Sequence, residues 1–493
     1  MDKKCGVLLP VFSLPSKYGI GTLGKWAYKF VDLLKETGHS YWQMLPLVQT
    51  GYCDSPYSTC ADISGNPYFI DPEILRTKKL LTYREVEKLI DKSEKIDYGK
   101  LYSTRYEMLR LAFSRFDTAD KAFKKFLKRG DFNNYALFMA LKQKFNKPWN
   151  EWDDCYKFRN ETTLKEFEKE NKQEILFWQF IQFEFENEYL ELKKYANSKG
   201  VKIVGDLPLY VAFDSVDVWA NPQEFRLDEN YKPSVVSGVP PDYFSRTGQL
   251  WGNPVYNYAK MRENGFSFWK NRVAHARKLY DLVRIDHFRG IDRYWVVPYG
   301  EETAINGWWE DGPKMDLINA VGSENLFAED LGMIDDGVRK LLSDSGLYGI
   351  KVLLFAFDSD KNNLYLPWNL NENSVIYTGT HDNSTIVGAL KGMDKEILER
   401  QKAMIKEALD YLKIYKSTQG VYKTADAIID IAYASKSNIA IIPMQDILLL
   451  DDEYRINTPG KVGAWTMRLK ESMVFTDNVK LTMKRRAKRF NRG

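Results

Sequence analysis

The sequence predicts an α/β protein built on a (β/α)8 barrel, the TIM-barrel architecture, and three observations support this. Eight short apolar runs rich in β-branched residues recur along the chain and end in polar, Gly or Pro residues. Helical patterns such as Phe268–Leu282 and Lys395–Tyr415 occupy many of the intervals between them. The length of 493 residues suits one barrel with insertions. We therefore expect a single barrel over residues 1–493, without a separate C-terminal β-sandwich domain.

Each expected barrel strand is a short buried run bounded by polar residues or by turn formers. In chain order, the eight runs are Cys5–Leu9, Tyr41–Leu45, Lys202–Gly205, Leu282–Ile285, Leu326–Ala328, Lys351–Phe355, Val375–Thr378 and Ile439–Ile442. The first run follows Lys3 and Lys4, as the apolar part of a short signal peptide does. Pro10 interrupts it, however, and no small-residue cleavage site follows. We therefore interpret it as a buried strand.

The irregular spacing of the runs predicts insertions in the barrel. Residues 71–170, between the second and third strands, are rich in Lys, Glu, Phe and Leu at helical spacing, which predicts a helical insertion. Residues 235–258 have no usable periodicity, so we expect a long loop there. Long loops in compact domains are usually functional or disordered, and the aromatic content of this one argues against disorder. We expect it to form a lid over the active site.

Charge and hydropathy exclude two classes of partner. The chain has 71 basic and 67 acidic residues, and seven of the basic ones lie in Lys480–Gly493, so the remainder carries about −3. A nearly neutral body has no basic face to follow phosphates, so we expect no nucleic-acid partner and interpret the basic segment as a solvated terminal helix. No run of about 18 apolar residues is present, so we expect no membrane-spanning segment.

The cysteines and one acidic segment bear on metals and on location. Cys5, Cys53, Cys60 and Cys155 lack metal-site spacing and disulfide-scaffold density, which favours free thiols in a reducing cytoplasm. The segment 358–369 begins like a calcium loop but has Asn in place of the required Gly and of the bidentate Glu. We therefore expect no metal site. Nothing in the sequence indicates an oligomeric state.

Acidic residues follow four of the expected strands, where a barrel carries its catalytic groups. They are Asp206, Asp286, Glu329 and Asp382, after the third, fourth, fifth and seventh runs. One acid at a strand end is common. Four acids at the same end of one barrel predict a site whose chemistry depends on carboxylates.

Arg284 and Asp286 lie two residues apart on one expected strand, so both side chains face the barrel lumen. Two interpretations remain open at this point. The pair is either a structural buried ion pair or a carboxylate held ionised by a guanidinium, as a nucleophile requires. Glu329 favours the second, because glycoside cleavage needs two carboxyls that flank the scissile bond. Glu329 would then be the general acid, with its pKa raised by the apolar strand and by nearby anions.

Asp382 adds a third carboxylate, which is suited to binding sugar hydroxyls and to stabilising oxocarbenium charge. His381 beside it has two interpretations. It either donates a hydrogen bond to a hydroxyl of the same sugar or is a hydrogen-bonded core histidine.

Several segments resemble glycoside hydrolase family 77, the 4-α-glucanotransferases, which are also called amylomaltases or disproportionating enzymes. In the family's order over nearly the whole chain, the matching segments are Ser13–Ser16 with Gly19–Gly21, Ser55–Ser58, Gly65–Tyr68, Gly205–Pro208, Val239–Pro254, Arg284–Gly290, Ala328–Gly332 and Thr378–Asn383. A single motif of this kind is modest evidence. The ordered set is specific.

The resemblance implies a retaining double displacement on α-1,4-glucans such as starch, glycogen and malto-oligosaccharides. Asp286 would form a glucosyl-enzyme, Glu329 would act as acid and then base, and Asp382 would stabilise the transition state. Substrate-binding roles would fall to Tyr57, as an aromatic platform, and to Asp206, Trp251, Arg284, His381 and Asn383. The loop around Trp251 would screen out water. Family members need no metal and no organic cofactor.

The chain departs from the family pattern at a few positions. Trp368 replaces a usual His, Ala464 replaces a common Asn, and Asp292-Arg293 replaces a more usual pair. These departures concern acceptor preference, since none affects the three carboxylates. Two alternatives to a transferase remain, an α-amylase-like hydrolase with the same carboxylates and a catalytically silent glucan-binding protein.

Overall fold

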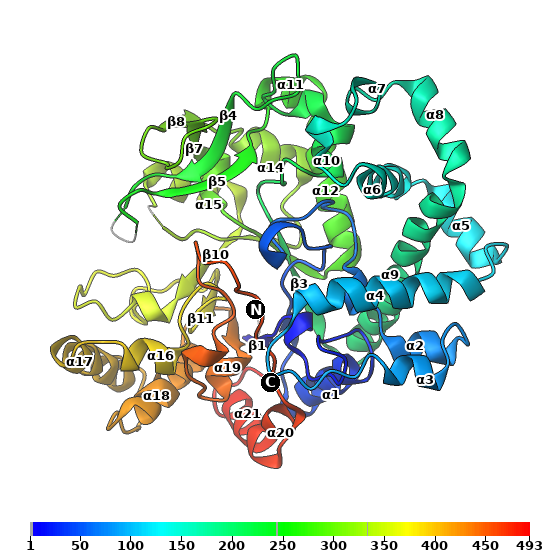
Figure 1. Ribbon diagram of the computed structural model, residues 1–493. Coiled ribbons are helices and arrows are strands. Elements are labelled where there is room, and N and C mark those ends of the chain that lie inside the picture. Colours follow the sequence, from blue (N-terminus) through cyan, green and yellow to red (C-terminus); the bar gives the residue numbers. More distant parts are fainter. Residues whose placement is uncertain (1–2, 243–244, 333) are drawn as a thin grey trace.

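The structure is a computed structural model that describes residues 3–242, 245–332 and 334–493 (Figure 1). Within these ranges, eight parallel strands close into a barrel, which confirms the predicted fold. The barrel strands are β1 (Lys4–Leu8), β2 (Tyr41–Gln43), β3 (Lys202–Leu207), β6 (Leu282–Ile285), β9 (Leu326–Ala328), β10 (Tyr348–Val352), β11 (Ser374–Tyr377) and β12 (Ile439–Pro443). They follow one another around the barrel in chain order, and β12 returns to pair with β1.

The sixth barrel strand differs from the prediction. We expected Lys351–Phe355, but β10 begins at Tyr348, and Leu353–Phe355 form a turn of 3-10 helix. Gly349 is the reason for the error, because a glycine between apolar residues indicates a turn. In the structure, a Cβ at Gly349 would lie 2.7 Å from a carboxylate oxygen of Asp330. This strand therefore needs glycine where the side chain of Asp330, two residues after β9, approaches it.

Helices cover the outside of the barrel. They include α1 (Lys25–Thr37), α9 (Lys172–Ser198), α12 (Ser267–Leu279), α14 (Met315–Val321), α15 (Asp336–Ser345), α16 (Ile386–Lys391), α17 (Lys395–Tyr411), α18 (Val421–Ala434) and α21 (Asp477–Arg489). In α1, the buried residues Ala27, Phe30, Val31 and Leu34 recur at helical spacing, and Gly38 ends the helix in the left-handed conformation. No helix among the described residues is long and apolar enough to cross a membrane.

Short helices fill the interval between β2 and β3 and pack on one side of the barrel (Figure 1). They are α2 (Pro72–Thr77), α3 (Tyr83–Glu87), α4 (Tyr98–Arg115), α5 (Lys121–Arg129), α6 (Asn133–Phe145), α7 (Asp154–Lys157) and α8 (Glu161–Glu170). Phe116, from the end of α4, lies 4.8 Å from Phe180 of the barrel helix α9, measured between ring centroids. Aromatic packing of this kind joins the helices to the barrel.

Residues 235–258, which we expected to form an irregular loop, contain two strands instead. β4 (Val235–Val239) and β5 (Gln249–Pro254) join β7 (Arg293–Pro298) and β8 (Trp308–Asp311) in an antiparallel sheet of order β5-β4-β7-β8 within the described ranges. This sheet stands above the barrel in Figure 1. The prediction failed for two reasons. β4 pairs with a strand that is distant in sequence, and the glycines and prolines of the segment interrupt the alternation of apolar and polar residues that would indicate a strand. Tyr243 and Phe244 of the expected lid lie outside the described residues.

The basic C-terminal segment is only partly solvated, contrary to the prediction. Within α21, Arg486 donates to the carboxylate of Asp430 over 2.9 Å. Arg492 is fully buried, and its guanidinium donates to the backbone oxygens of Tyr433 (2.6 Å) and Lys4 (3.0 Å). It also donates to the backbone oxygens of Ser435 and Ser437. Two of the seven charges are therefore used inside the fold, at the amino end of the barrel.

Candidate active site

Arg284 bridges two carboxylates at the carboxyl ends of β3 and β6. Its Nε and Nη2 donate to Asp206 over 2.9 Å and 2.7 Å, and Nη2 also donates to Asp286 over 2.7 Å. The Asp206 side chain is 0% exposed and that of Arg284 is 4% exposed, whereas the Asp286 side chain is 27% exposed. Register places Asp206 opposite Arg284 in the barrel sheet. The guanidinium neutralises the buried Asp206 and leaves Asp286 as the carboxylate with an open side.

Glu329, at the carboxyl end of β9, is held by two backbone donors. The N–H of His287 donates to Oε2 over 2.7 Å, and the N–H of Leu331 donates to Oε1 over 2.9 Å. His287 has a φ of +50°, the left-handed region that non-glycine residues rarely adopt. This conformation accompanies the hydrogen bond that joins the residue after Asp286 to Glu329. Strained backbone of this kind is typical of functional sites.

The two carboxyls titrate as a coupled pair. Burial, together with the negative charge of Asp286, raises the pKa of Glu329 to about 8. Burial also raises the pKa of Asp286, to about 7, although the Arg284 guanidinium opposes this rise. When the pair holds one proton, that proton therefore resides mainly on Glu329. The arrangement provides an acid and an anionic nucleophile in the same site.

Asp382 and His381 lie in the loop that follows β11. Asp382 Oδ2 lies 3.3 Å from His381 Nε2, and Oδ1 accepts a 2.6 Å hydrogen bond from Asn457 Nδ2. The Asp382 side chain is 45% exposed. His381 is buried, and burial lowers its pKa, so the ring is neutral around pH 7. Asn383 has a local function, because its side-chain oxygen accepts from the N–H of Thr380 and closes the turn that carries Asp382.

Tyr57 connects the first carboxylate pair to the histidine. Its hydroxyl donates to Asp206 Oδ2 over 2.5 Å and accepts from Arg284 Nη2 over 3.2 Å. Its ring is stacked on His381, with centroids 5.1 Å apart and planes 13° apart. Trp465 lies 5.8 Å from Tyr57 in a tilted arrangement. Tyr57, His381 and Trp465 thus form an aromatic cluster beside the carboxylates.

Trp251, on β5, contacts the residue that follows Asp286. Its ring contacts that of His287 edge to face, with centroids 4.8 Å apart, and its Nε1 donates to Gln249 over 3.2 Å. About a third of the residue is exposed. The small sheet therefore reaches the segment that follows Asp286.

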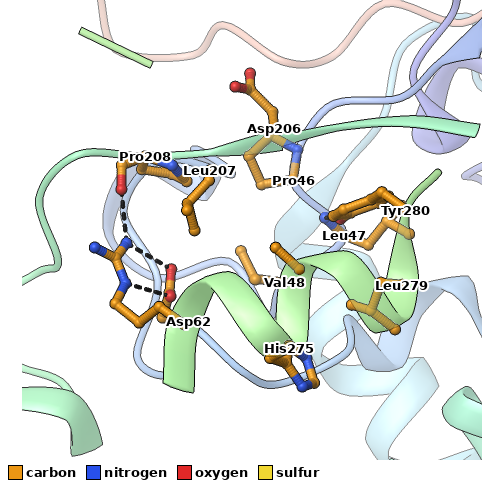
Figure 2. A pocket seen from close by; sticks show the side chains of 12 residues that line it. Pro46, Leu47, Val48, Asp62, Asp206, Leu207, Pro208, His275, Leu279 and Tyr280 are labelled. Carbon is orange, nitrogen blue, oxygen red and sulfur yellow. Dashed lines mark hydrogen bonds and ion pairs between the residues drawn. The ribbon is translucent and has the colours of Figure 1, made fainter. Parts of the chain in front are cut away.

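A small cavity of about 20 Å³ lies behind Asp206 (Figure 2). Figure 2 shows the Asp206 carboxylate pointing away from it, with Leu47, Val48 and Leu279 around it. A buried ion pair closes one side, where Arg272 Nε donates to Asp62 over 2.7 Å. The volume accommodates about one water molecule and no sugar ring. This cavity is therefore too small for a glucan, and the Asp206 carboxylate points away from it, towards Arg284.

Comparison with known proteins identifies the family. A family model described as 4-alpha-glucanotransferase matches residues 9–474. The chain belongs to this family. A 4-alpha-glucanotransferase from Clostridium butyricum is 42% identical over 481 residues, which cover 95% of this chain and 96% of that protein. One from Aquifex aeolicus is 43% identical over 475 residues, covering 94% and 95%. An amylomaltase from Streptococcus agalactiae, solved in complex with acarbose, superposes with a TM-score of 0.93 at 35% identity and with complete coverage of both chains.

As a 4-alpha-glucanotransferase family member, the protein is an enzyme with transferase activity on α-1,4-glucans. The same comparisons favour neither the hydrolase alternative nor the silent binding protein.

Sequence reasoning assigned no role to three residues that contact the candidate site, namely His287, Asn457 and Trp465. His287 belongs to a motif that we identified, but its backbone conformation cannot be read from residue type. Asn457 and Trp465 come from a segment without helical or strand periodicity. The available signal was its Asn, Gly and Trp content, which is typical of a functional loop.

Proposed function

We propose that the chain transfers segments of an α-1,4-glucan by a retaining double displacement, with Asp286 as nucleophile and Glu329 as acid and base. One observation carries this proposal. Arg284 pairs with Asp286 and favours its anion, while Glu329 has the higher pKa and keeps a proton. Retaining glycoside cleavage requires one ionised carboxylate as nucleophile and one protonated carboxyl as acid.

In the first step, a carboxylate oxygen of Asp286 attacks the anomeric carbon of the donor sugar. The bond from that carbon to the glycosidic oxygen breaks, and Glu329 transfers its proton to the leaving oxygen. The products are a glucosyl ester of Asp286, a shortened glucan and an ionised Glu329. The backbone donors of His287 and Leu331 stabilise this new carboxylate.

In the second step, the 4-hydroxyl of an acceptor glucose or malto-oligosaccharide attacks the glucosyl ester, in the role that water has in a hydrolase. Glu329 removes the hydroxyl proton as the oxygen attacks the anomeric carbon, and the ester bond to Asp286 breaks. The proton returns to Glu329, so acid and nucleophile are restored. Two inversions at one carbon retain the α configuration.

Further residues would bind the sugar that reacts or support the residues that bind it. Asp382 accepts hydrogen bonds from its hydroxyls and stabilises the oxocarbenium charge, while Asp206 supports Arg284. His381 covers one face of the Tyr57 ring, so Tyr57 offers an edge or its remaining face as the platform. Asn383 supports the Asp382 loop.

The sheet of β4, β5, β7 and β8 would act as the lid, and the helical insertion at 71–170 would act as a separate subdomain. Trp251 would shield the glucosyl ester from water, which favours an acceptor sugar over hydrolysis. Trp368 and Ala464 would alter the acceptor preference. Starch-derived or glycogen-derived malto-oligosaccharides are the proposed donors. The cytoplasm is the proposed location, which the free thiols of the four cysteines support.

Incubation of the pure protein with maltotriose tests the proposal. A ladder of products longer than maltotriose is expected, and glucose and maltose without any longer product would contradict transfer. Asp286→Asn tests the nucleophile, because the neutral amide cannot form the ester. A loss of several orders of magnitude in kcat is expected, and activity that survives this change would remove Asp286 from the mechanism.

A further inference from the structure

We propose that Asn457 is a positioning residue that holds the Asp382 carboxylate in its working orientation. This inference depends on the proposed role of Asp382. The argument begins with exposure, since the Asp382 side chain is 45% exposed and packing does not fix it. Among the described residues, the contacts to its carboxylate are the 2.6 Å hydrogen bond from Asn457 and the 3.3 Å contact with His381. The shorter contact is the one to Asn457.

Asn457 is itself fixed by the segment that carries Asp382. The N–H of Asn457 donates to the backbone oxygen of His381 over 3.1 Å. Arg455 Nε donates to the backbone oxygen of Asn457 over 2.6 Å, and Arg455 Nη2 donates to that of Asp382 over 2.5 Å. Arg455 Nη1 also donates to Ser384 Oγ over 3.1 Å. These hydrogen bonds fix the backbone around Asn457 against the backbone around Asp382, so the Asn457 amide points at Asp382 Oδ1.

Residues 455–469 form a strap between the 3-10 turn Asp452–Tyr454 and helix α20 (Glu471–Val474). The strap corresponds to the orange-to-red trace between α19 (Met444–Ile447) and α20 in Figure 1. Its far end is anchored away from Asp382, where Arg468 Nη2 donates to the backbone oxygen of Ser16 over 2.6 Å and Nη1 donates to that of Ser93. Asn457 thus projects from a segment that is tied at both ends.

The chemistry of an amide suits this role. The side-chain nitrogen of Asn457 donates at every pH at which the enzyme is folded, because an amide does not titrate in that range. One hydrogen bond to Oδ1 leaves lone pairs on both carboxylate oxygens for sugar hydroxyls. Loss of the amide would let the exposed carboxylate rotate. A misplacement of about 1 Å in an active site costs about 100-fold in rate.

Asn457→Ala, Asn457→Asp and Arg468→Ala test the inference in the full-length enzyme. Initial rates of maltotriose disproportionation give kcat and KM from pH 5 to pH 9, and thermal unfolding gives Tm. For Asn457→Ala we expect kcat to fall by about 10–100-fold, with KM within about threefold and Tm near that of wild type. Arg468→Ala loosens the strap elsewhere, so it is expected to lower Tm and to leave kcat within about twofold.

Asn457→Asp has nearly the same shape but places a second carboxyl against Asp382. Repulsion between the two carboxylates would turn Asp382 out of its orientation, so kcat should fall at least as far as in Asn457→Ala. A kcat within about twofold of wild type in Asn457→Asp would overturn the inference. So would a kcat loss in Arg468→Ala equal to that in Asn457→Ala, because general loosening of the strap would then account for both.

The proposed function fails separately from this inference. If Asp382→Asn retains activity, Asp382 has no role in transfer and both ideas fall. If Asp382→Asn is inactive while Asn457→Ala keeps wild-type kcat, the positioning role alone is refuted.

Discussion

The backbone N–H of His287 donates a 2.7 Å hydrogen bond to Glu329, and His287 directly follows Asp286 in the chain. The two proposed catalytic carboxyls are therefore separated by one residue and one hydrogen bond. His287 adopts a φ of +50° while making this bond. Movement of either carboxyl would disturb the other, so their spacing is set by backbone rather than by flexible side chains.

The pH dependence of transfer should be bell-shaped and narrow. The nucleophile must be ionised, and burial raises the pKa of Asp286 to about 7, which sets the acidic limb. The acid must be protonated, and burial raises the pKa of Glu329 to about 8, which sets the alkaline limb. We expect kcat/KM for maltotriose to be highest between these values. A flat profile from pH 5 to pH 9 would contradict these assignments.

Glu329→Gln should inactivate the enzyme and change how its stability depends on pH. The pKa of Glu329 rises from 4.5 to about 8 on folding, so wild type loses stability as the pH increases between those values. Glutamine does not titrate and avoids this loss. The Tm of the variant relative to that of wild type should therefore increase from about pH 5 to pH 8. Its amide nitrogen cannot accept from one of the two backbone donors, which lowers its Tm by the same amount at every pH in this range. A constant Tm difference across this range would show that ionisation of Glu329 does not oppose folding.

Trp251→Ala should increase hydrolysis relative to transfer. Removal of the ring opens a route for water to the segment around His287, so the ratio of transfer to glucose release should fall by about tenfold. Trp308→Ala is the matched control, because Trp308 is similarly exposed but lies on β8 at the edge of the small sheet. Chromatography of the products from maltotriose measures the ratio of transfer to glucose release in each variant. Equal ratios in the two variants would argue against a shielding role.

Gly205→Ala should destabilise the protein and reduce activity together. A Cβ at Gly205 would lie 2.1 Å from ring atoms of Tyr280, so the strand that carries Asp206 would have to shift. Overpacking of this kind costs about 1–3 kcal/mol of unfolding free energy. Gly99→Ala, in helix α4, is the control. A Cβ at Gly99 would lie 3.5 Å from Asp97 Oδ1, an ordinary contact distance, and alanine favours a helix. Urea denaturation should separate the two variants.

Arg492→Met should lower stability without changing the chemistry. The buried guanidinium satisfies several backbone oxygens, and each one left unpaired costs about 1–3 kcal/mol. Arg485→Ala removes an exposed charge from the same region and should change Tm little. The variants are expected to share the wild-type kcat, because both positions lie at the amino end of the barrel. Equal Tm values for the two would refute the assigned role of Arg492.

The barrel was predictable because its strands are buried on both sides and read as continuous apolar runs. Seven of the eight expected runs overlap the observed strands almost fully, and the sixth was displaced by Gly349. The small sheet was not predictable from local pattern, since Val236 pairs with Val297 across about 60 residues. Local periodicity carries no information about such a partner.

The site was predictable where a side chain lies at the carboxyl end of a strand, as those of Asp206, Asp286 and Glu329 do. Their grouping follows from barrel geometry alone. The contact between Asn457 and Asp382 was not predictable, because it joins two loops 75 residues apart. The left-handed turn at His287 was equally hidden, since histidine gives no indication of positive φ.

Closure of the barrel has a consequence for synthesis of the chain. Lys4 in β1 pairs with Ile439 in β12, and the Lys4 backbone oxygen accepts from Arg492. Until β12 has left the ribosome during translation, one edge of β1 has no strand to pair with. Tyr57 and His381 come from opposite halves of the sequence, so the aromatic cluster beside the carboxylates also assembles late. The nascent protein is therefore inactive, with an open sheet edge, for most of its translation.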